Sequence, residues 1–189
     1  MNELGSDGSA AIVFQDEVHF SIQSTIMRSW SPKGSRPKVK SYAGRKNASY
    51  SGFVLPESGE LFVSRPAVFN WQTTIESIRA FLSSSAGRLE GRRIILVMDN
   101  APWHRKARRL VSSCSEYQDI RDKVSMVSLP PYSPDLNPIE QVWRITRREK
   151  THNRFWKDID TLSSMLDSWF ESFGTPDAKL RSFCSFKTN

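Results

Sequence analysis

The chain of 189 residues has few cysteines and no long apolar segment. Only Cys114 and Cys184 occur, without CxxC spacing or a secretory signal, so we expect two ordinary thiols in a reducing compartment. No apolar stretch approaches the roughly 20 residues that span a bilayer, so we expect no membrane partner. The sequence also lacks an internal repeat, an interdomain linker and any convincing Ser-His-Asp or Cys-His pattern. These absences favour a soluble, cytoplasmic protein that does not use a covalent protein nucleophile.

Aromatic residues and positive charge, in contrast, are abundant. Six Trp and eleven Phe within a hydrophobic content of 38% predict a packed globule, and the length fits one domain. We expect this domain at residues 10–173, between a flexible N-terminal tail at 1–9 and a C-terminal tail at 174–189. The 27 Lys and Arg against 20 Asp and Glu give a net charge of +7, which favours nucleic acid or another anionic partner. Ribosomal and membrane-surface proteins share such a charge, so charge alone is weak support.

The order of apolar runs and turn signals predicts an α/β domain with a central mixed β-sheet flanked by helices. Strands are expected at 10–16, 94–99 and 124–129, a β-hairpin at 48–55 and 60–63, and helices at 71–82, 103–118 and about 158–173. Four prolines within 129–138 exclude a helix or a central strand there, so this segment is expected to be a rigid loop. A further helix follows it, with Asn137 as its cap and Pro138 at its first position.

Three acidic residues stand where a metal-dependent nuclease would place them. Asp16 and Asp99 each end an apolar run, and Glu140 lies just inside the helix after the Pro-rich loop. Two strand-end carboxylates and one helix carboxylate could converge on a pair of Mg²⁺ ions. Each acid also has an ordinary alternative, because Asp is common in turns and Glu140 has capping-box spacing from Asn137.

The residues around Asp99 strengthen the catalytic interpretation. Asn100 and His104 follow it closely and could position a phosphate or a water, although His104 could also simply hydrogen-bond across the loop. Glu17 is a poorer metal ligand than Asp16, because successive strand residues point to opposite faces. His19 and His152 are expected to be structural or surface residues.

Four motifs resemble the catalytic domain of mariner-like transposases, and in particular their bacterial insertion-sequence branch. They are Asp16-Glu17 after an apolar run, Trp30-Ser31-Pro32-Lys33-Gly34, Asp99-Asn100-Ala101-Pro102-Trp103-His104, and the block from Pro131 to Trp143. The last is the most specific, because generic folding does not require a long Pro-rich loop that runs into this helix. Together the motifs cover about residues 10–150.

The resemblance implies a ribonuclease-H-like DDE catalytic domain that cleaves and transfers DNA strands. Asp16, Asp99 and Glu140 would then hold two Mg²⁺ or Mn²⁺ ions, of which one activates water or a DNA 3′-hydroxyl and the other stabilises the leaving oxygen. The alternatives are a non-catalytic DNA-binding remnant and another ribonuclease-H-like nuclease.

Basic residues follow each of the three acids in the sequence and are expected to contact DNA phosphates. Such clusters often mark only a solvated face. The expected contacts are Lys33, Arg36, Lys38, Lys40, Arg45, Lys46, Arg105, Lys106, Arg108, Arg109, Arg144, Arg147 and Arg148.

Relatives of this kind usually carry helix-turn-helix modules ahead of the catalytic domain, and this sequence has almost nothing before its first strand. We therefore expect one half of a split transposase, a truncated relic or a fragment, with a separately encoded helix-turn-helix subunit as a possible partner. Transposon ends and target DNA are the other expected partners, within a homodimer or a larger synaptic assembly. The resemblance implies a nucleoid-associated location in the cytoplasm.

Overall fold

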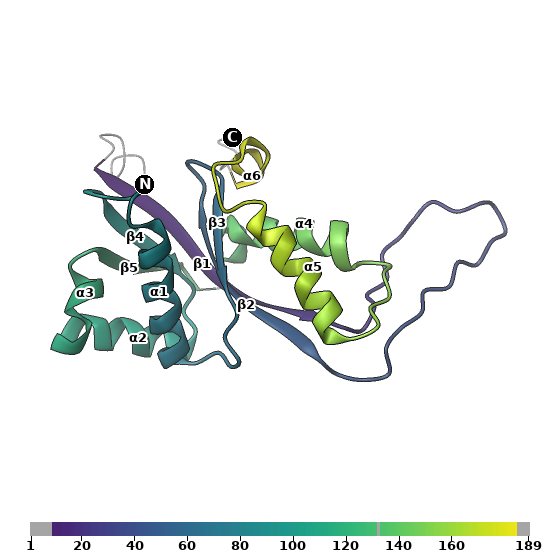
Figure 1. The fold of residues 1–189 in the computed structure, drawn as a ribbon, viewed down its shortest axis with the longest axis horizontal. Coiled ribbons are helices and arrows are strands. Elements are labelled where there is room, and N and C mark those ends of the chain that lie inside the picture. Colours follow the sequence, from purple (N-terminus) through teal and green to yellow (C-terminus); the bar gives the residue numbers. More distant parts are fainter. Residues whose placement is uncertain (1–8, 132, 185–189) are drawn as a thin grey trace.

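Five strands form one mixed sheet at the centre of the molecule, as the computed structural model shows (Figure 1). The structure describes residues 9–131 and 133–184, so the expected tail at 1–9 lies almost entirely outside the described residues. The strands are β1 (Ala10–Ser21), β2 (Asn47–Leu55), β3 (Glu60–Ser64), β4 (Arg93–Met98) and β5 (Val124–Ser128). Their order is β3-β2-β1-β4-β5, in which β2 runs antiparallel to both its neighbours while β1, β4 and β5 are parallel.

Helices cover both faces of this sheet (Figure 1). They are α1 (Trp71–Ser85), α2 (Pro102–Ser113), α3 (Gln118–Arg121), α4 (Ile139–Thr146), α5 (Ile159–Glu171) and α6 (Ala178–Cys184), with short helical turns η1 (Ser115–Tyr117), η2 (Pro134–Leu136) and η3 (Arg147–Thr151). Asn70 caps α1 through a reciprocal pair of hydrogen bonds with Thr73, so the cap predicted from the sequence is confirmed. The predicted α/β class with a central mixed sheet is confirmed too.

Two hydrophobic cores lie on the opposite faces of the sheet. One lies under α4, α5 and α6, where Phe20, Tyr50, Trp143 and Phe170 pack edge-to-face or tilted against one another. The other lies under α1 and α2 and includes residues such as Phe53, which stacks on Phe81 with ring centroids 4.9 Å apart. Because side chains alternate along a strand, β1 supplies Phe14, Val18 and Phe20 to the first core and Ala11 and Val13 to the second.

Two boundaries differ from the sequence-based expectation, and the expected rigid loop contains a helical turn. β1 continues to Ser21, so Asp16 lies within the strand rather than at its end, because pairing with β2 extends over this region. α2 ends at Ser113, well before residue 118, because the hydroxyls of Ser112 and Ser113 bond back to the carbonyl of Arg109 and compete with further helix. The Pro-rich loop contains the single turn η2.

Asn137 does not cap α4. Its side-chain amide is buried and donates instead to the carbonyl of Gln15 on β1, at 3.3 Å, and α4 has no side-chain cap. Further along, the segment expected as a tail contains α6, which packs against α4 and places Leu180 and Cys184 in the first core. Thus the buried structure continues beyond residue 173.

A long loop, residues 22–46, connects β1 to β2 and extends away from the rest of the molecule (Figure 1). Its base is held by Asn153, whose side chain bonds both the backbone N–H and the carbonyl of Met27. Beyond the base, Trp30 is fully exposed at 102% relative accessibility. We call this loop the arm.

Candidate active site

The two catalytic aspartates predicted from the sequence lie where β1 and β4 stop pairing. The last parallel pair joins Phe14 to Val97. Asp16 and Asp99 each stand two residues further along, at the carboxyl edge of the parallel strands where α/β folds gather their ligands. The Pro-rich loop begins at this edge as well, because the N–H of Leu129 bonds the carbonyl of Met98 at 2.8 Å.

The structure brings all three predicted carboxylates to one cavity. Asp16, Asp99 and Glu140 line a cavity of about 760 Å³, whose other lining residues come from the β4–α2 turn, α2, the end of β5 and the Pro-rich loop. Asn100, also predicted from the sequence, lies in the same lining, and its side chain donates to the carbonyl of Leu129. Asn100 therefore ties the start of the Pro-rich loop to the end of β4.

Asp16 lies in an electrostatically unfavourable position. Its Oδ2 accepts a hydrogen bond from the indole N–H of Trp143 at 3.0 Å. Burial, followed by the nearby carboxylates of Glu140 and Glu17, raises the pKa of Asp16 to about 7 despite that hydrogen bond. Gly52 on β2, which pairs with Asp16, leaves room for the indole of Trp143. A Cβ at this position would stand 2.5 Å from the indole ring.

Asp99 is held from the other side by His104. Its Oδ1 accepts from Nδ1 of His104 at 2.6 Å and from the N–H of Ala101 at 2.9 Å, so both bonds leave Oδ2 for another partner. Nε2 of His104 lies 2.7 Å from Oε1 of Glu17. Burial opposes the imidazolium, but the bonds to Asp99 and Glu17 outweigh it and raise the pKa of His104 to about 9, while the bond from His104 lowers the pKa of Asp99.

His104 is buried, with 1% of its surface exposed, and does not line the cavity. Both ring nitrogens are occupied by carboxylates. It therefore cannot touch a phosphate or a water in this conformation, contrary to the first of the two roles considered from the sequence. It bonds Asp99 and Glu17 instead, and so fixes the orientation of the Asp99 carboxylate. Glu17 points away from Asp16, as the strand alternation predicts.

The donor chemistry of the cavity fits a hard divalent cation. Its three carboxylates supply oxygen ligands, and a bound cation would offset the burial and the carboxylate repulsion that raise the pKa of Asp16. The fit is not preformed, because no group of three His, Cys, Asp or Glu within residues 9–131 and 133–184 is arranged to hold an ion.

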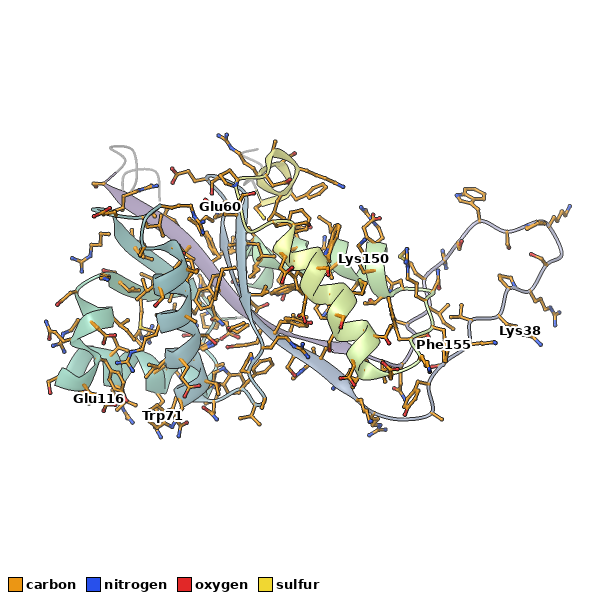
Figure 2. All side chains as sticks on the ribbon, in the orientation of Figure 1. Lys38, Glu60, Trp71, Glu116, Lys150 and Phe155 are labelled. Atoms are coloured by element: carbon orange, nitrogen blue, oxygen red, sulfur yellow. The ribbon has the colours of Figure 1, made fainter. Side chains whose placement is uncertain are left out.

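The predicted DNA-contacting residues do not gather in one place. Arg105 lines the main cavity, and Arg144 lines a smaller one with Glu140. Lys33, Arg36, Lys38, Lys40, Arg45 and Lys46 are all exposed on the arm and do not line the main cavity, and Figure 2 shows Lys38 far out on this loop. The remaining predicted contacts lie on α2 (Lys106, Arg108, Arg109) and in η3, where Arg147 lies over the Phe20 ring and Arg148 pairs with Glu149.

Sequence reasoning missed two residues of this site. Trp143 was read only as part of a motif, although its spacing from Glu140 (three residues along one helix) would place both on the same face. Gly52 carried no signal, because only the pairing of β1 with β2 brings it beside Asp16.

A central mixed sheet with three carboxylates at the carboxyl edge of its parallel strands is the arrangement expected of a ribonuclease-H-like domain. A family model of the DDE superfamily endonucleases matches residues 11–163, and the chain belongs to this family. A curated relative, the uncharacterized protein y4pE/y4sA of Sinorhizobium fredii (strain NBRC 101917 / NGR234), is 34% identical over 73 residues, which cover 39% of this chain and 47% of that protein.

Solved structures of the Mos1 mariner transposase share the fold. The paired-end complex with Mn matches with a TM-score of 0.63 and 18% identity over 92% of this chain and 51% of that chain. The strand transfer complex matches with a TM-score of 0.60 and 17% identity over 93% and 51%. The predicted ribonuclease-H-like fold is thereby confirmed, and the predicted DDE endonuclease family is the one whose model matches. The chain spans about half the length of these relatives. None of the helices described is long and apolar enough to cross a membrane.

Proposed function

We propose that this chain is the catalytic domain of a DDE transposase that cleaves and joins DNA strands with divalent metal ions. The observation that carries the proposal is the convergence of Asp16, Asp99 and Glu140 on one cavity of a DDE endonuclease fold. The substrates are DNA, at transposon ends and at a target site. Mos1 structures with Mn and Mg support the same choice of ions here.

Asp16, Asp99 and Glu140 would hold the ions, two in number. When bound, such ions lower the pKa of water or of a DNA 3′-hydroxyl and stabilise the leaving oxygen. Trp143 orients Asp16, and His104 orients Asp99 with Oδ2 free. The Pro-rich loop, tied down by Asn100 and Asn137, forms a wall that positions the phosphodiester.

Nicking of supercoiled DNA in Mg²⁺ or Mn²⁺ tests the proposal. Asp99→Asn and Glu140→Gln should each reduce the rate by about a thousandfold, because several kcal/mol of charge stabilisation depend on the ions. Glu76→Gln is the matched control, since it removes one exposed carboxylate on α1 away from the cavity. Full metal-dependent nicking by Asp99→Asn would refute the assignment of the three acids.

A second candidate function is DNA binding without catalysis. Two observations favour it. Among the described residues, no group of three His, Cys, Asp or Glu is arranged to hold an ion, and the basic arm is exposed. Salt-sensitive DNA binding without nicking in any divalent metal would support it. The third alternative, a ribonuclease-H-type nuclease, predicts faster cleavage of an RNA–DNA hybrid than of duplex DNA.

Recognition of transposon ends would need more than this domain. Because the chain spans about half of the Mos1 chains, we propose that a helix-turn-helix part, encoded separately or in a longer form of the protein, supplies end specificity. A homodimer or synaptic assembly on DNA is part of the same proposal. Size measurement of the chain with and without a helix-turn-helix partner and end DNA tests it.

A further inference from the structure

A second cavity, of about 510 Å³, lies between α2 and the edge strand β5. Four arginines surround it, and Val124 and Met126 of β5 form its apolar side. The arginines are Arg105, Arg108, Arg109 and Arg121. We call it the arginine cavity. Three of its arginines were expected from the sequence to contact DNA, whereas Arg121 was not.

The spacing of the residues explains why the arginines gather here. Arg105, Arg108 and Arg109 are related by three and four positions along α2, which places them on one face of the helix. Ala107, on the opposite face of α2, is buried in the second core, and Val111 is buried there too while it also lines the arginine cavity. Arg121 comes from α3, and its guanidinium donates to the carbonyls of Val111 and Ser112 at the end of α2.

These four guanidinium groups keep their positive charge unneutralised. Within the part of the chain that the structure describes, none of them lies within salt-bridge distance of a carboxylate. Arg121 and Arg108 are held by neutral acceptors only, the latter by the hydroxyl of Ser128. Five other arginines, in contrast, have an acidic partner: Arg65, Arg79, Arg88, Arg92 and Arg148. The arginine cavity is therefore suited to an external anion.

Two residues connect this cavity to the candidate active site. Arg105 lines both cavities. Ser128, which holds Arg108, lines the active-site cavity at the end of β5. A polyanion that enters one cavity is thus adjacent to the other.

We propose that the arginine cavity binds a backbone phosphate of the DNA strand whose scissile phosphodiester lies among Asp16, Asp99 and Glu140. The inference rests on the proposed function. Guanidinium groups bind phosphate oxygens through paired N–H donors, and an arginine held by a neutral acceptor is already oriented for this. The arm, in contrast, offers exposed charge without a cavity.

Binding of a fluorescent DNA duplex, followed by anisotropy without divalent metal over a range of salt concentrations, tests the site. Arg109→Ala should weaken binding about tenfold, as loss of one charged hydrogen bond does. The slope of log K against log salt should become less steep by about 0.9 for each lost phosphate contact. Arg109→Lys should keep the slope and recover part of the affinity. Arg109 is exposed, so its replacement leaves the cores intact.

Arg181→Ala is the control, because Arg181 is exposed on α6 and its loss changes the net charge equally. Arg181→Ala should leave the affinity for DNA within about twofold of wild type. An equal loss of affinity in both variants would contradict the proposed site, because it would show that only net charge matters. Unchanged binding by Arg109→Ala, with wild type binding normally, would overturn the site and leave the proposed function standing. Absence of DNA binding by wild type would overturn both.

Discussion

The two faces of β1 carry acidic side chains in contrasting electrostatic environments. On the face toward α2, the His104 ring lies between Glu17 and Asp99, and its bond lowers the pKa of Asp99. On the face toward α4, Asp16 lies near Glu140 with the neutral indole of Trp143 as its donor, and its pKa rises to about 7. One face therefore contains its own cation, and the other does not.

This difference indicates which carboxylates are prepared for an external cation. A buried carboxylate near other carboxylates costs stability, and proteins accept such a cost chiefly at functional sites. Asp99 belongs to both environments, because Oδ1 is bonded to His104 and Ala101 while Oδ2 is left for a ligand. Removing the charge of Asp16 or of His104 tests this difference between the two electrostatic environments.

The largest stability effect is expected for Asp16→Asn, which should stabilise the metal-free protein by up to about 4 kcal/mol above pH 7. Because the folded-state pKa of Asp16 is about 7 and the ordinary pKa of aspartate is 3.8, the wild type loses stability as pH rises between these values and levels off above them. Asparagine keeps an acceptor for Trp143 and avoids this loss. Urea unfolding in a chelator across this pH range measures the effect. A difference that does not vary with pH would contradict the explanation.

The next effect is expected for His104→Gln, which should lower metal-dependent nicking about 10–100-fold, as loss of a ligand-orienting residue does. The folded-state pKa of His104 is about 9, against an ordinary histidine pKa of 6.5. The stability that its charge adds is therefore complete below pH 6.5 and is lost as pH rises through 9. The free energy of unfolding of the wild type should therefore exceed that of the variant by the largest amount below pH 6.5. His19→Gln is the matched control, since His19 is exposed and bonds Ser49.

The smallest effect is stabilisation by the cation itself. At a Mg²⁺ concentration about ten times the dissociation constant, the wild type should gain about 1.4 kcal/mol of unfolding free energy. Glu140→Gln should gain less, and Glu76→Gln should gain as much as wild type. Thermal unfolding with and without Mg²⁺ provides the measurement. Equal gains in wild type and Glu140→Gln would place the bound ion elsewhere.

Local sequence patterns predicted most of the elements. The apolar runs located β1, β4 and β5, the turn around Gly59 located the β2–β3 hairpin, and Asn70 marked the start of α1. Errors occurred where a residue's partner is distant in sequence. Asn137 looked like a helix cap but bonds Gln15 across the fold, and Asp16 looked like a strand end although β2 pairs beyond it.

The sequence by itself determined the acidic motif residues, the alternation that separates Asp16 from Glu17, and the excess of positive charge. Tertiary structure alone decided that His104 turns away from the cavity to join Glu17 and Asp99, and that Arg121 joins the arginines of α2. The physical reason is that spacing along one strand or helix fixes which face a side chain occupies. Which charges meet across elements depends on how the strands pair and how the helices pack over them.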